Sequence, residues 1–395
     1  MRSVAGRSFV LLTSLLVVLA ATPVTAAAPS SGASESVIVV FRDRVADAPA
    51  LAHQLGRQYG FAPLFVYQHA LKGFAASLPS GAVAALSHDP NVAWVEADGP
   101  VWLVTDQAPA TWGLDRIDEK FRPMDGNYTS DYTGAGVTAY IIDTGIRISH
   151  AEFGGLGGRA SYGYDSVDGS LPADDCHGHG THVAGTTGGA TYGVAKAANL
   201  VAVRVLNCNG SGTWSGVIAG IDWVTGDHAA NAPAVANMSL GGNANSSVDT
   251  AVRNSIADGV SYAVAAGNGN IVGIAQDACK YSPARVTEAM TIGAIDSTDK
   301  KASWSNYGDC VDWFAPGVSI TSAWKDSDSA IKTISGTSMA TPHTAGAAAL
   351  YLQEFPGSTP QQVRDGLYAR TTKGIVTSSR TANNHLLCSL AVCPD

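Results

Sequence analysis

Three short segments of this sequence place an acid, a histidine and a serine beside glycines. Asp143 ends an apolar run and precedes a Thr-Gly turn, His179 lies between two glycines, and Ser338 stands two residues after a glycine. Together these side chains could activate a hydroxyl nucleophile, because histidine takes its proton and the acid orients the imidazole. Taken singly, each segment has a plainer explanation: a turn-forming acid, a metal-binding histidine or a helix-capping serine.

The order of the three residues separates two kinds of hydrolase. The order Asp, His, Ser is that of subtilisin, whereas an α/β-hydrolase needs Gly-x-Ser-x-Gly with the acid and histidine after the serine. Position 340 is alanine, and only 57 residues follow Ser338. Ser338 is expected at a helix start, where unpaired N–H groups favour negative charge. Pro342 cannot bond back to the Ser338 carbonyl, which predicts local slack there.

Two other classes of function remain open from these residues. A metallohydrolase could use His177, His179, His182 and Cys176, which are close in sequence, although the chain has no His-Glu-x-x-His helix. That function would leave the segment around Ser338 unexplained. A non-catalytic binding protein on the same fold is the second alternative. An active-site serine reagent distinguishes a serine enzyme from both.

The elements that must position these residues alternate along the later part of the chain. Apolar runs predict strands ending at Asp143 and spanning residues 200–206, 234–240, 260–266 and 290–295, and helices are expected at 180–188, 214–228, 247–258 and 337–353. Strands that alternate with helices predict an α/β fold with a mostly parallel sheet between two helical layers. The carboxyl ends of such strands meet at one edge, which is where open α/β sheets place their sites.

The N-terminal part reads as two processed segments. Arg2, Arg7 and a short apolar run predict a signal peptide over residues 1–28, too short to span a bilayer. Residues 29–104 are expected to be a separate domain, a small α+β unit with strands at 36–42, 71–78 and 92–96 and helices at 48–59 and 80–87.

The first 104 residues carry no net charge, so the whole net charge of −9 falls on residues 105–395. This argues against a nucleic-acid partner, and no membrane contact is expected after export.

Eight segments together resemble the subtilases, and most closely the aqualysin-type bacterial enzymes of the proteinase K branch. They are WGLDRID (112–118), YIIDTGI (140–146), GHGTHVAGT (178–186), VRVLNCNGSG (203–212), VANMSLGG (235–242), AVAAGNGN (263–270), SNYGDCVDWFAPG (305–317) and SGTSMATPH (335–343). The resemblance implies a secreted serine endopeptidase that hydrolyses peptide bonds through an acyl-enzyme, with Asp143, His179 and Ser338 as its triad. It also implies a subtilisin-like three-layer fold over residues 105–395 and broad specificity with an apolar preference.

The resemblance assigns further residues to catalysis and substrate binding. The amide of Asn268 and the backbone N–H of Ser338 are expected to bind the oxyanion. Two extended segments are expected to hold the peptide as a strand: Gly210, Ser211 and Gly212, and Ser239, Leu240 and Gly241. Ala265, Ala266 and Gly267 are expected to line the main specificity pocket. Trp214 would cover a second apolar subsite, with a core aromatic as the alternative. The loop after Asn268 is about five residues longer than in the family, so fine specificity does not carry over.

Disulfides and structural Ca²⁺ are also implied. Six cysteines in an exported chain allow 15 connectivities. The family pattern pairs Cys176 with Cys208 and Cys279 with Cys310, which leaves Cys388 to pair with Cys393 unless these two are free or intermolecular. One calcium site is expected at Asp312 with the carbonyls of Thr287 and Ala289. A second is expected at Asp115, Asp118, Glu119, Asp125 and Asn127, since Ca²⁺ gathers clustered oxygens. A weaker candidate for a further calcium site consists of Asp165, Asp168, Asp174 and Asp175. For these four acids, an ordinary solvated acidic surface is the favoured interpretation.

Residues 36–101 resemble the inhibitor propeptide of the same enzymes. This implies a precursor whose propeptide acts as an intramolecular chaperone and inhibitor until self-cleavage near Thr105. Polypeptide substrates are the other expected partner, and the mature enzyme is expected to be monomeric.

Overall fold

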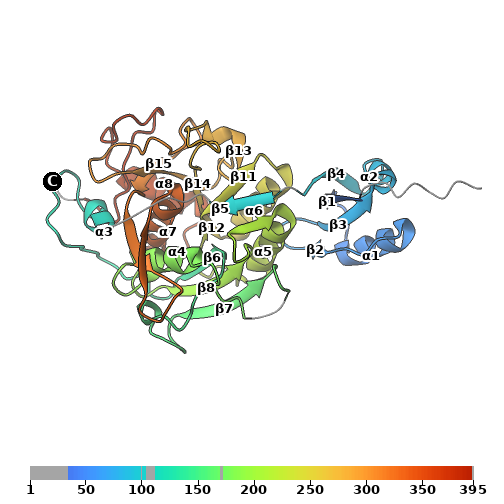
Figure 1. The fold of residues 1–395 in the computed structure, drawn as a ribbon, viewed down its shortest axis with the longest axis horizontal. Coiled ribbons are helices and arrows are strands. Elements are labelled where there is room, and N and C mark those ends of the chain that lie inside the picture. Colours follow the sequence, from blue (N-terminus) through green and yellow to red (C-terminus); the bar gives the residue numbers. More distant parts are fainter. Residues whose placement is uncertain (1–33, 99, 104–111, 170–171, 394–395) are drawn as a thin grey trace, which may run out of the picture.

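The computed structural model describes residues 34–98, 100–103, 112–169 and 172–393, which form a small unit and a large one (Figure 1). The expected signal peptide and the expected cleavage point near Thr105 lie outside the described residues. Among the residues that are described, no helix combines the length and apolar character needed to cross a membrane.

The small unit contains one antiparallel sheet with two helices. Its strand order is β2-β3-β1-β4, so the strands expected at 36–42, 71–78 and 92–96 lie side by side. The elements are β1 (Ser34–Phe41), α1 (Ala48–Tyr59), β2 (Phe65–Tyr67), β3 (Gly73–Pro79), α2 (Ser80–Leu86) and β4 (Val92–Ala97). Asp47 caps α1 by accepting the N–H of Ala50, and Gly60 ends it in a left-handed conformation. One face of the sheet packs on these helices.

The large unit is built on a seven-stranded sheet in which every pairing is parallel. The order across the sheet is β15 (Trp313–Pro316), β14 (Met290–Ile295), β12 (Ser261–Ala265), β10 (Ala234–Met238), β6 (Thr138–Asp143), β8 (Asn199–Arg204) and β7 (Ala160–Asp165). Its central strands are buried on both faces, which matches their nearly unbroken apolar sequences. The expected parallel α/β fold is therefore confirmed.

Two helical layers cover this sheet, and each layer encloses one part of the core. One layer holds α4 (His179–Gly188) and α7 (Thr337–Glu354), with α8 (Pro360–Arg370) packed behind α7. The other holds α5 (Trp214–Asp227) and α6 (Ser246–Asp258), and its core also includes side chains of the small unit. In Figure 1 the small unit lies at one end of the molecule, beside α5 and α6.

Smaller elements complete the large unit. A four-stranded sheet has the order β13-β11-β5-β9, and a two-stranded ribbon pairs β16 with β17. These elements are α3 (Trp112–Ile117), β5 (Pro100–Leu103), β9 (Ser211–Thr213), β11 (Leu240–Asn243), β13 (Tyr281–Ser282), β16 (Ile320–Ala323) and β17 (Ile331–Ile334), with single 3-10 turns at Ala151–Phe153 and Ala278–Lys280. The prediction of one strand at 234–240 was wrong in one respect. The strand ends at Met238, and Leu240 begins a strand of the smaller sheet.

Candidate active site

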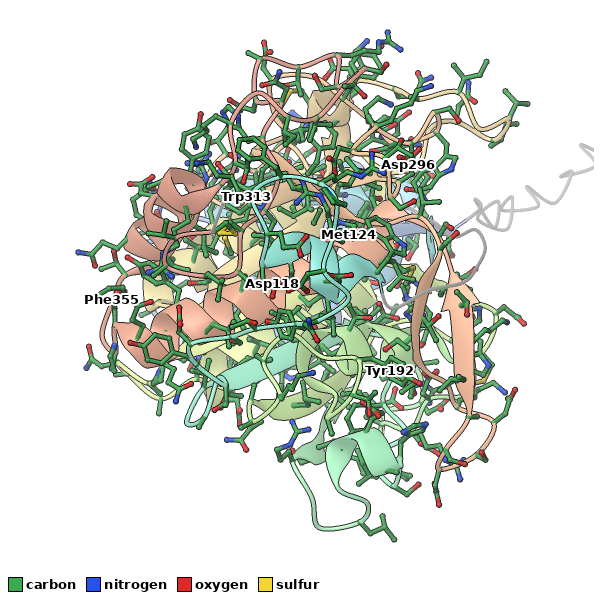
Figure 2. The ribbon with its side chains drawn as sticks, turned by 90° about the vertical axis from the view of Figure 1, so that its left-hand side faces the viewer. Asp118, Met124, Tyr192, Asp296, Trp313 and Phe355 are labelled. Atoms are coloured by element: carbon green, nitrogen blue, oxygen red, sulfur yellow. A yellow bond between two sulfur atoms is a disulfide. The ribbon has the colours of Figure 1, made fainter. Side chains whose placement is uncertain are left out.

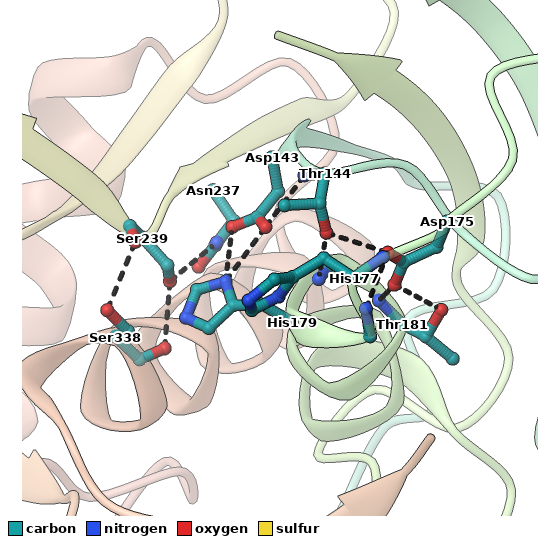
Figure 3. A network of polar contacts seen from close by, with 11 residues as sticks. Asp143, Thr144, Asp175, His177, His179, Thr181, Asn237, Ser239 and Ser338 are labelled. Carbon is teal, nitrogen blue, oxygen red and sulfur yellow. Dashed lines mark hydrogen bonds and ion pairs between the residues drawn. The ribbon is translucent and has the colours of Figure 1, made fainter. Parts of the chain in front are cut away.

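Asp143 and His179 meet where β6 ends and α4 begins. Asp143 is the last residue of β6 and His179 the first residue of α4, and both side chains are buried. Nδ1 of His179 lies 2.8 Å from Oδ1 and 3.0 Å from Oδ2 of Asp143 (Figure 3). The backbone N–H of Thr144 also donates to Oδ1 at 2.8 Å. A carboxylate in this position holds the proton on Nδ1 and leaves Nε2 to act as a base.

A second buried acid, Asp175, holds the first turn of α4 in place. The N-cap residue Gly178 has no side chain, so the capping bonds must come from elsewhere. Asp175 accepts the N–H groups of Gly178 at 2.7 Å and of Thr181 at 2.8 Å. The hydroxyl of Thr144 accepts the N–H of Gly180 at 2.9 Å and donates to Asp175 at 2.9 Å. The residue after Asp143 is therefore bonded to the helix that carries His179 (Figure 3).

Gly178 could not be replaced by another residue without strain. Its φ is +109°, and a Cβ there would lie 2.5 Å from the ring of Trp324. The two glycines beside His179 therefore let the chain turn tightly between Trp324 and the end of β6.

Ser338 is the second residue of α7 and is hydrogen-bonded to Ser239. Because Pro342 has no N–H, the carbonyl of Ser338 has no helical donor, and the hydroxyl of Ser239 donates to it at 2.8 Å. The expected slack at this point was wrong, since Ser239 takes the vacant position. The hydroxyl of Ser338 donates to the carbonyl of Ser239 at 3.0 Å, and the Asn237 amide donates to Ser239 Oγ at 2.9 Å.

In Figure 3 the ring of His179 lies between Asp143 and Ser338. Nε2 of His179 is buried and has no hydrogen-bond partner within the described part of the chain. The atom that would act as the base is thus not engaged by another described side chain.

Asn268 reaches the same edge of the sheet from the end of β12. Its side-chain oxygen Oδ1 accepts hydrogen bonds from the backbone N–H of Thr337 at 2.9 Å and from the Thr337 hydroxyl at 2.7 Å. Gly267, with a φ of +97°, makes the turn that brings Asn268 there. Because the oxygen is fixed, the amide nitrogen is the end of the side chain that can donate to something else.

An extended segment of the same chain, β5, lies between two strands next to these residues. β5 pairs antiparallel with β9 on one side and with β11 on the other (Figure 1). Trp102 is paired with both Ser211 and Gly241, and Leu103 with Leu240. Gly210 immediately precedes β9 and has a φ of +72°. The two segments that the family resemblance assigned to peptide binding therefore lie on either side of β5.

A pocket of about 670 Å³ opens between β11 and the end of β12. Leu240, Gly241, Ala265, Ala266, Gly267 and Asn268 are among its lining residues. Trp214, at the start of α5, is only 2% exposed and belongs to the core on that face of the sheet.

Comparisons with known proteins agree with this geometry. Residues 134–386 match the subtilase family, peptidase S8. The chain belongs to the subtilase family. An extracellular serine proteinase of Thermus sp. is 57% identical over 322 residues, which cover 82% of this chain and 76% of the relative. An alkaline serine exoprotease A of Vibrio alginolyticus is 52% identical over 82% of this chain and 60% of its own length. The crystal structure of a cold-adapted subtilisin-like serine proteinase matches with a TM-score of 0.67 and 54% identity, covering 72% of this chain and 99% of the other. This subtilase is accordingly a serine proteinase, and the resemblance inferred from its motifs is confirmed.

The structure pairs all six cysteines of this subtilase. The disulfides are Cys176–Cys208, Cys279–Cys310 and Cys388–Cys393. The third closes a C-terminal loop whose Ser389 donates through its N–H and its hydroxyl to the carbonyl of Ile117 in α3. The metallohydrolase alternative loses support, because Cys176 is in a disulfide and Nε2 of His182 is bonded to the carbonyls of Ile320 and Lys332. Burial lowers the pKa of His182 to about 3, which keeps it neutral.

Three of the five residues expected at the second calcium site come together. One carboxylate oxygen from each of Asp115, Glu119 and Asp125 lies within 4.8 Å of the other two. Oε2 of Glu119 is buried without a hydrogen-bond partner among the described residues. This acidic cluster could hold a metal ion. Figure 2 faces this side of the molecule, with Asp118 and Met124 labelled on the same loop.

The other two residues expected at this site, Asp118 and Asn127, do not belong to the three-carboxylate cluster. Asp118 accepts the N–H of Thr129 at 2.5 Å and is not part of the three-carboxylate cluster, and the N–H of Asn127 donates to Asp125 at 2.7 Å. Burial raises the pKa of Asp118 to about 6.

The other acidic groups already have protein partners. Asp312 receives Arg364 Nη2 on Oδ1 at 2.5 Å and the N–H of Thr291 on Oδ2 at 2.8 Å. A cation bound there with the carbonyls of Thr287 and Ala289 would have to share Oδ1 with Arg364 or displace it. Of the four acids in the weaker candidate, Asp165 and Asp168 form ion pairs with Arg204, and Asp175 accepts N–H groups at the start of α4.

Sequence reasoning did not assign Asp175, Thr144 and Ser239 Oγ to the positioning of the site. Asp175 stands three residues before the N-cap glycine of α4, and this spacing is the one signal that could have revealed it. Ser239 had no such signal, because its contact with Ser338 spans 99 residues of sequence.

Proposed function

We propose that this subtilase is a secreted serine endopeptidase whose triad is Asp143, His179 and Ser338. The observation that carries the proposal is the buried pair of Asp143 and His179 at 2.8 Å, at the sheet edge where Ser338 also lies. Secretion is supported by the extracellular Thermus relative and by the predicted signal peptide. Polypeptides are the substrates.

In the proposed mechanism Ser338 attacks the peptide carbonyl carbon. His179 takes the hydroxyl proton through Nε2 and then gives it to the leaving amine, while Asp143 stabilises the imidazolium. Rotation of the Ser338 side chain must first break its bond to the Ser239 carbonyl. Water then hydrolyses the acyl-enzyme by the same steps in reverse. The backbone N–H of Ser338 and the amide of Asn268 supply the donors for the oxyanion.

The substrate would bind as a strand between β9 and β11. The path of β5 supports this, because β5 makes backbone pairings on both sides that any peptide could make. Small residues at Ala265, Ala266 and Gly267 favour apolar side chains in the adjoining pocket. Broad specificity with an apolar preference follows from these two features. Trp214 would contribute apolar surface only after the precursor segment leaves.

Residues 29–104 would act as inhibitor and folding template. β5 occupies the space between β9 and β11, which is the cleft proposed for substrate, and Asp222 of α5 accepts the N–H groups of Gln68, His69 and Ala70 at 2.6–3.1 Å. Asp98 accepts the N–H of Ser215 at 2.7 Å at the start of α5. Such contacts would hold α5 in place while the large unit folds, and they would block the cleft until the chain is cut near Thr105.

Calcium is the structural ion we assign to the cluster of Asp115, Glu119 and Asp125. Three carboxylates suit a hard cation that accepts 6–8 oxygens in flexible geometry. The cluster would tie the loop at 115–127 to α3. The site at Asp312 is proposed as a second calcium site of lower occupancy because of Arg364.

Self-processing provides the test of this function. The purified Ser338→Ala protein should remain at precursor mass and should not cleave casein, because it lacks the nucleophile. The wild-type precursor should shorten to a product that begins near Thr105 and reacts with an active-site serine reagent. Intact mass spectrometry measures both. Maturation of the purified Ser338→Ala protein by itself would refute self-cleavage, and its casein hydrolysis would refute the triad.

A further inference from the structure

The pocket beside Asn268 is larger than one apolar side chain requires. One part of its lining, the inner wall, consists of the small residues Gly241, Ala265, Ala266 and Gly267. Its outer part is lined by the loop that follows Asn268, through Gly269, Asn270, Ile271 and Gly273. Since the inner wall offers little surface to grip, the outer wall determines how a long side chain is held.

The outer loop is closed by hydrogen bonds within itself and to Asn306. Oδ1 of Asn270 accepts the N–H groups of Val272 and Ile274, both at 3.1 Å, and the N–H of Asn270 donates to the carbonyl of Ile274 at 3.0 Å. Oδ1 of Asn306 closes the base of the loop by accepting the N–H groups of Gly269 and Gln276. Close to the loop, the disulfide Cys279–Cys310 follows.

This loop presents apolar side chains to water. Ile271 is fully exposed, and Val272 is 70% exposed. Ile271 lines the pocket, whereas Val272 does not. Exposed apolar surface at the mouth of a site gains free energy when a ligand covers it. The residue placed to gain from a ligand in the pocket is therefore Ile271.

The position of the pocket identifies the ligand group. Its wall is β11, whose residues Leu240 and Gly241 pair with β5, and Ser239 just before that strand contacts Ser338. A peptide that binds along the path of β5 and presents a carbonyl to Ser338 would direct the side chain of that same residue into the pocket.

We infer that Ile271 is a specificity-determining residue, which contacts the far end of a large apolar side chain immediately before the scissile bond. A phenylalanine there would reach Ile271, whereas an alanine would end among the small residues of the inner wall. Ile271 thus favours large apolar residues over small ones at this position. This inference rests on the proposed endopeptidase function and adds its substrate preference.

The test uses mature enzyme and three peptide p-nitroanilides that differ only in the residue before the nitroanilide: Ala, Leu or Phe. Ile271→Ser should lower the ratio of kcat/KM for Phe over Ala about five- to tenfold, because part of the apolar contact is lost. The value of kcat/KM for the Ala substrate should fall less than that for the Phe substrate, because an alanine side chain ends among the small residues of the inner wall. Val272→Ser removes a similar exposed side chain outside the pocket and should leave the ratio at the wild-type value, and Ile271→Leu should retain it.

Each outcome is informative. An unchanged ratio in Ile271→Ser, or an equal fall in Val272→Ser, would overturn the inference. If wild-type enzyme cleaved none of the substrates, or if Ser338→Ala cleaved them as well, the endopeptidase function itself would be wrong. The Ala substrate in wild-type enzyme therefore tests the function, and the ratio tests Ile271.

Discussion

The side chain of Asn268 is anchored by its oxygen and available through its nitrogen. Thr337 supplies two donors to the oxygen, one from its backbone and one from its hydroxyl. This bonding also favours one amide orientation, since the opposite orientation would set the amide NH2 group against the backbone N–H of Thr337. The proposed oxyanion donor is thus aligned before substrate arrives, which is the condition under which such a dipole lowers the barrier most.

Asn268→Leu should lower kcat about 10²–10³-fold with little change in KM. This is the range known for loss of the oxyanion donor in subtilisin, and the reason is that the oxyanion exists only in the transition state. Steady-state kinetics on one p-nitroanilide measure the split. Thr337→Val is the matched variant, because it removes one of the two anchors and keeps the amide, so its loss should be much smaller. A fall confined to KM would rule out this role for Asn268.

The element that carries His179 depends on a cap that lies outside the helix. α4 begins at the catalytic candidate itself, and Asp175 together with Thr144 satisfies the N–H groups of its first turn. The five hydrogen bonds that Asp175 accepts offset the cost of burying its charge only in part, since burial still raises its pKa. The direction of the His179 side chain is therefore determined by the loop before the helix as well as by Asp143.

Removing the hydroxyl of Thr144 should disturb that direction. We expect Thr144→Val to lower kcat about ten- to a hundredfold with KM nearly unchanged, because small displacements of a catalytic base are costly. Thr144→Ser keeps the hydroxyl and should restore most of kcat, whereas a merely structural role would show in the melting temperature and not in this rescue. Equal kcat in the Val and Ser variants would contradict the positioning role.

The acidic loop after α3 supports a prediction about calcium. The double variant Asp115→Asn with Asp125→Asn should lose one component of the calcium dependence of thermal inactivation, because binding to the folded state alone stabilises by RT ln(1 + [L]/Kd). Kinetic constants at saturating calcium should not change, since the cluster is remote from Ser338. Asp118→Asn is the control, because Asp118 lies outside the three-carboxylate cluster. An unchanged calcium titration in the double variant would identify these acids as ordinary surface charge.

The main elements of the large unit could be predicted because their apolar sequences are long and parallel strands bury both faces. The strand at residues 290–295 and the helix from Thr337 agree with the structure almost to the residue. Short strands such as β9 and β13 carry no such pattern, since they are two or three residues long and exist only through pairing. The acid, histidine and serine lay within recognisable motifs, whereas Asp175 and Ser239 act through partners that only the folded chain brings near.

At the scale of the whole molecule, the small unit and the large unit share polar contacts. Trp94 donates to Ser247, and Glu96 accepts the N–H of Ser246 at 3.0 Å at the start of α6. Asp222 makes the corresponding contact from the large unit to the turn at residues 68–70. Both acids accept backbone N–H groups, so the interface holds the small unit through the start of α6 and the turn at residues 68–70.

These carboxyls make the attachment of the small unit depend on pH. Burial outweighs the hydrogen bonds and raises the pKa of both Glu96 and Asp222 in the precursor. When the units separate, water reaches both groups and their pKa values return toward about 4. The attached state therefore binds more protons than the separated state, so attachment should strengthen as pH falls through the window above pH 4 and weaken as pH rises toward neutrality.

Hydrogen exchange in the full-length Ser338→Ala precursor can measure this dependence at the amides of residues 68–70, which donate to Asp222. After correction for intrinsic exchange, their protection should increase from pH 7 to pH 5, because opening of the interface releases protons. Asp222→Asn should reduce the slope, and adding Glu96→Gln should remove most of the remainder, since neither amide titrates. Protection that decreases on acidification would mean that loss of the charged acceptor outweighs the relief of burial. Attachment of the small unit would then weaken as pH falls. The raised pKa values of Glu96 and Asp222 predict the opposite, that attachment weakens as pH rises.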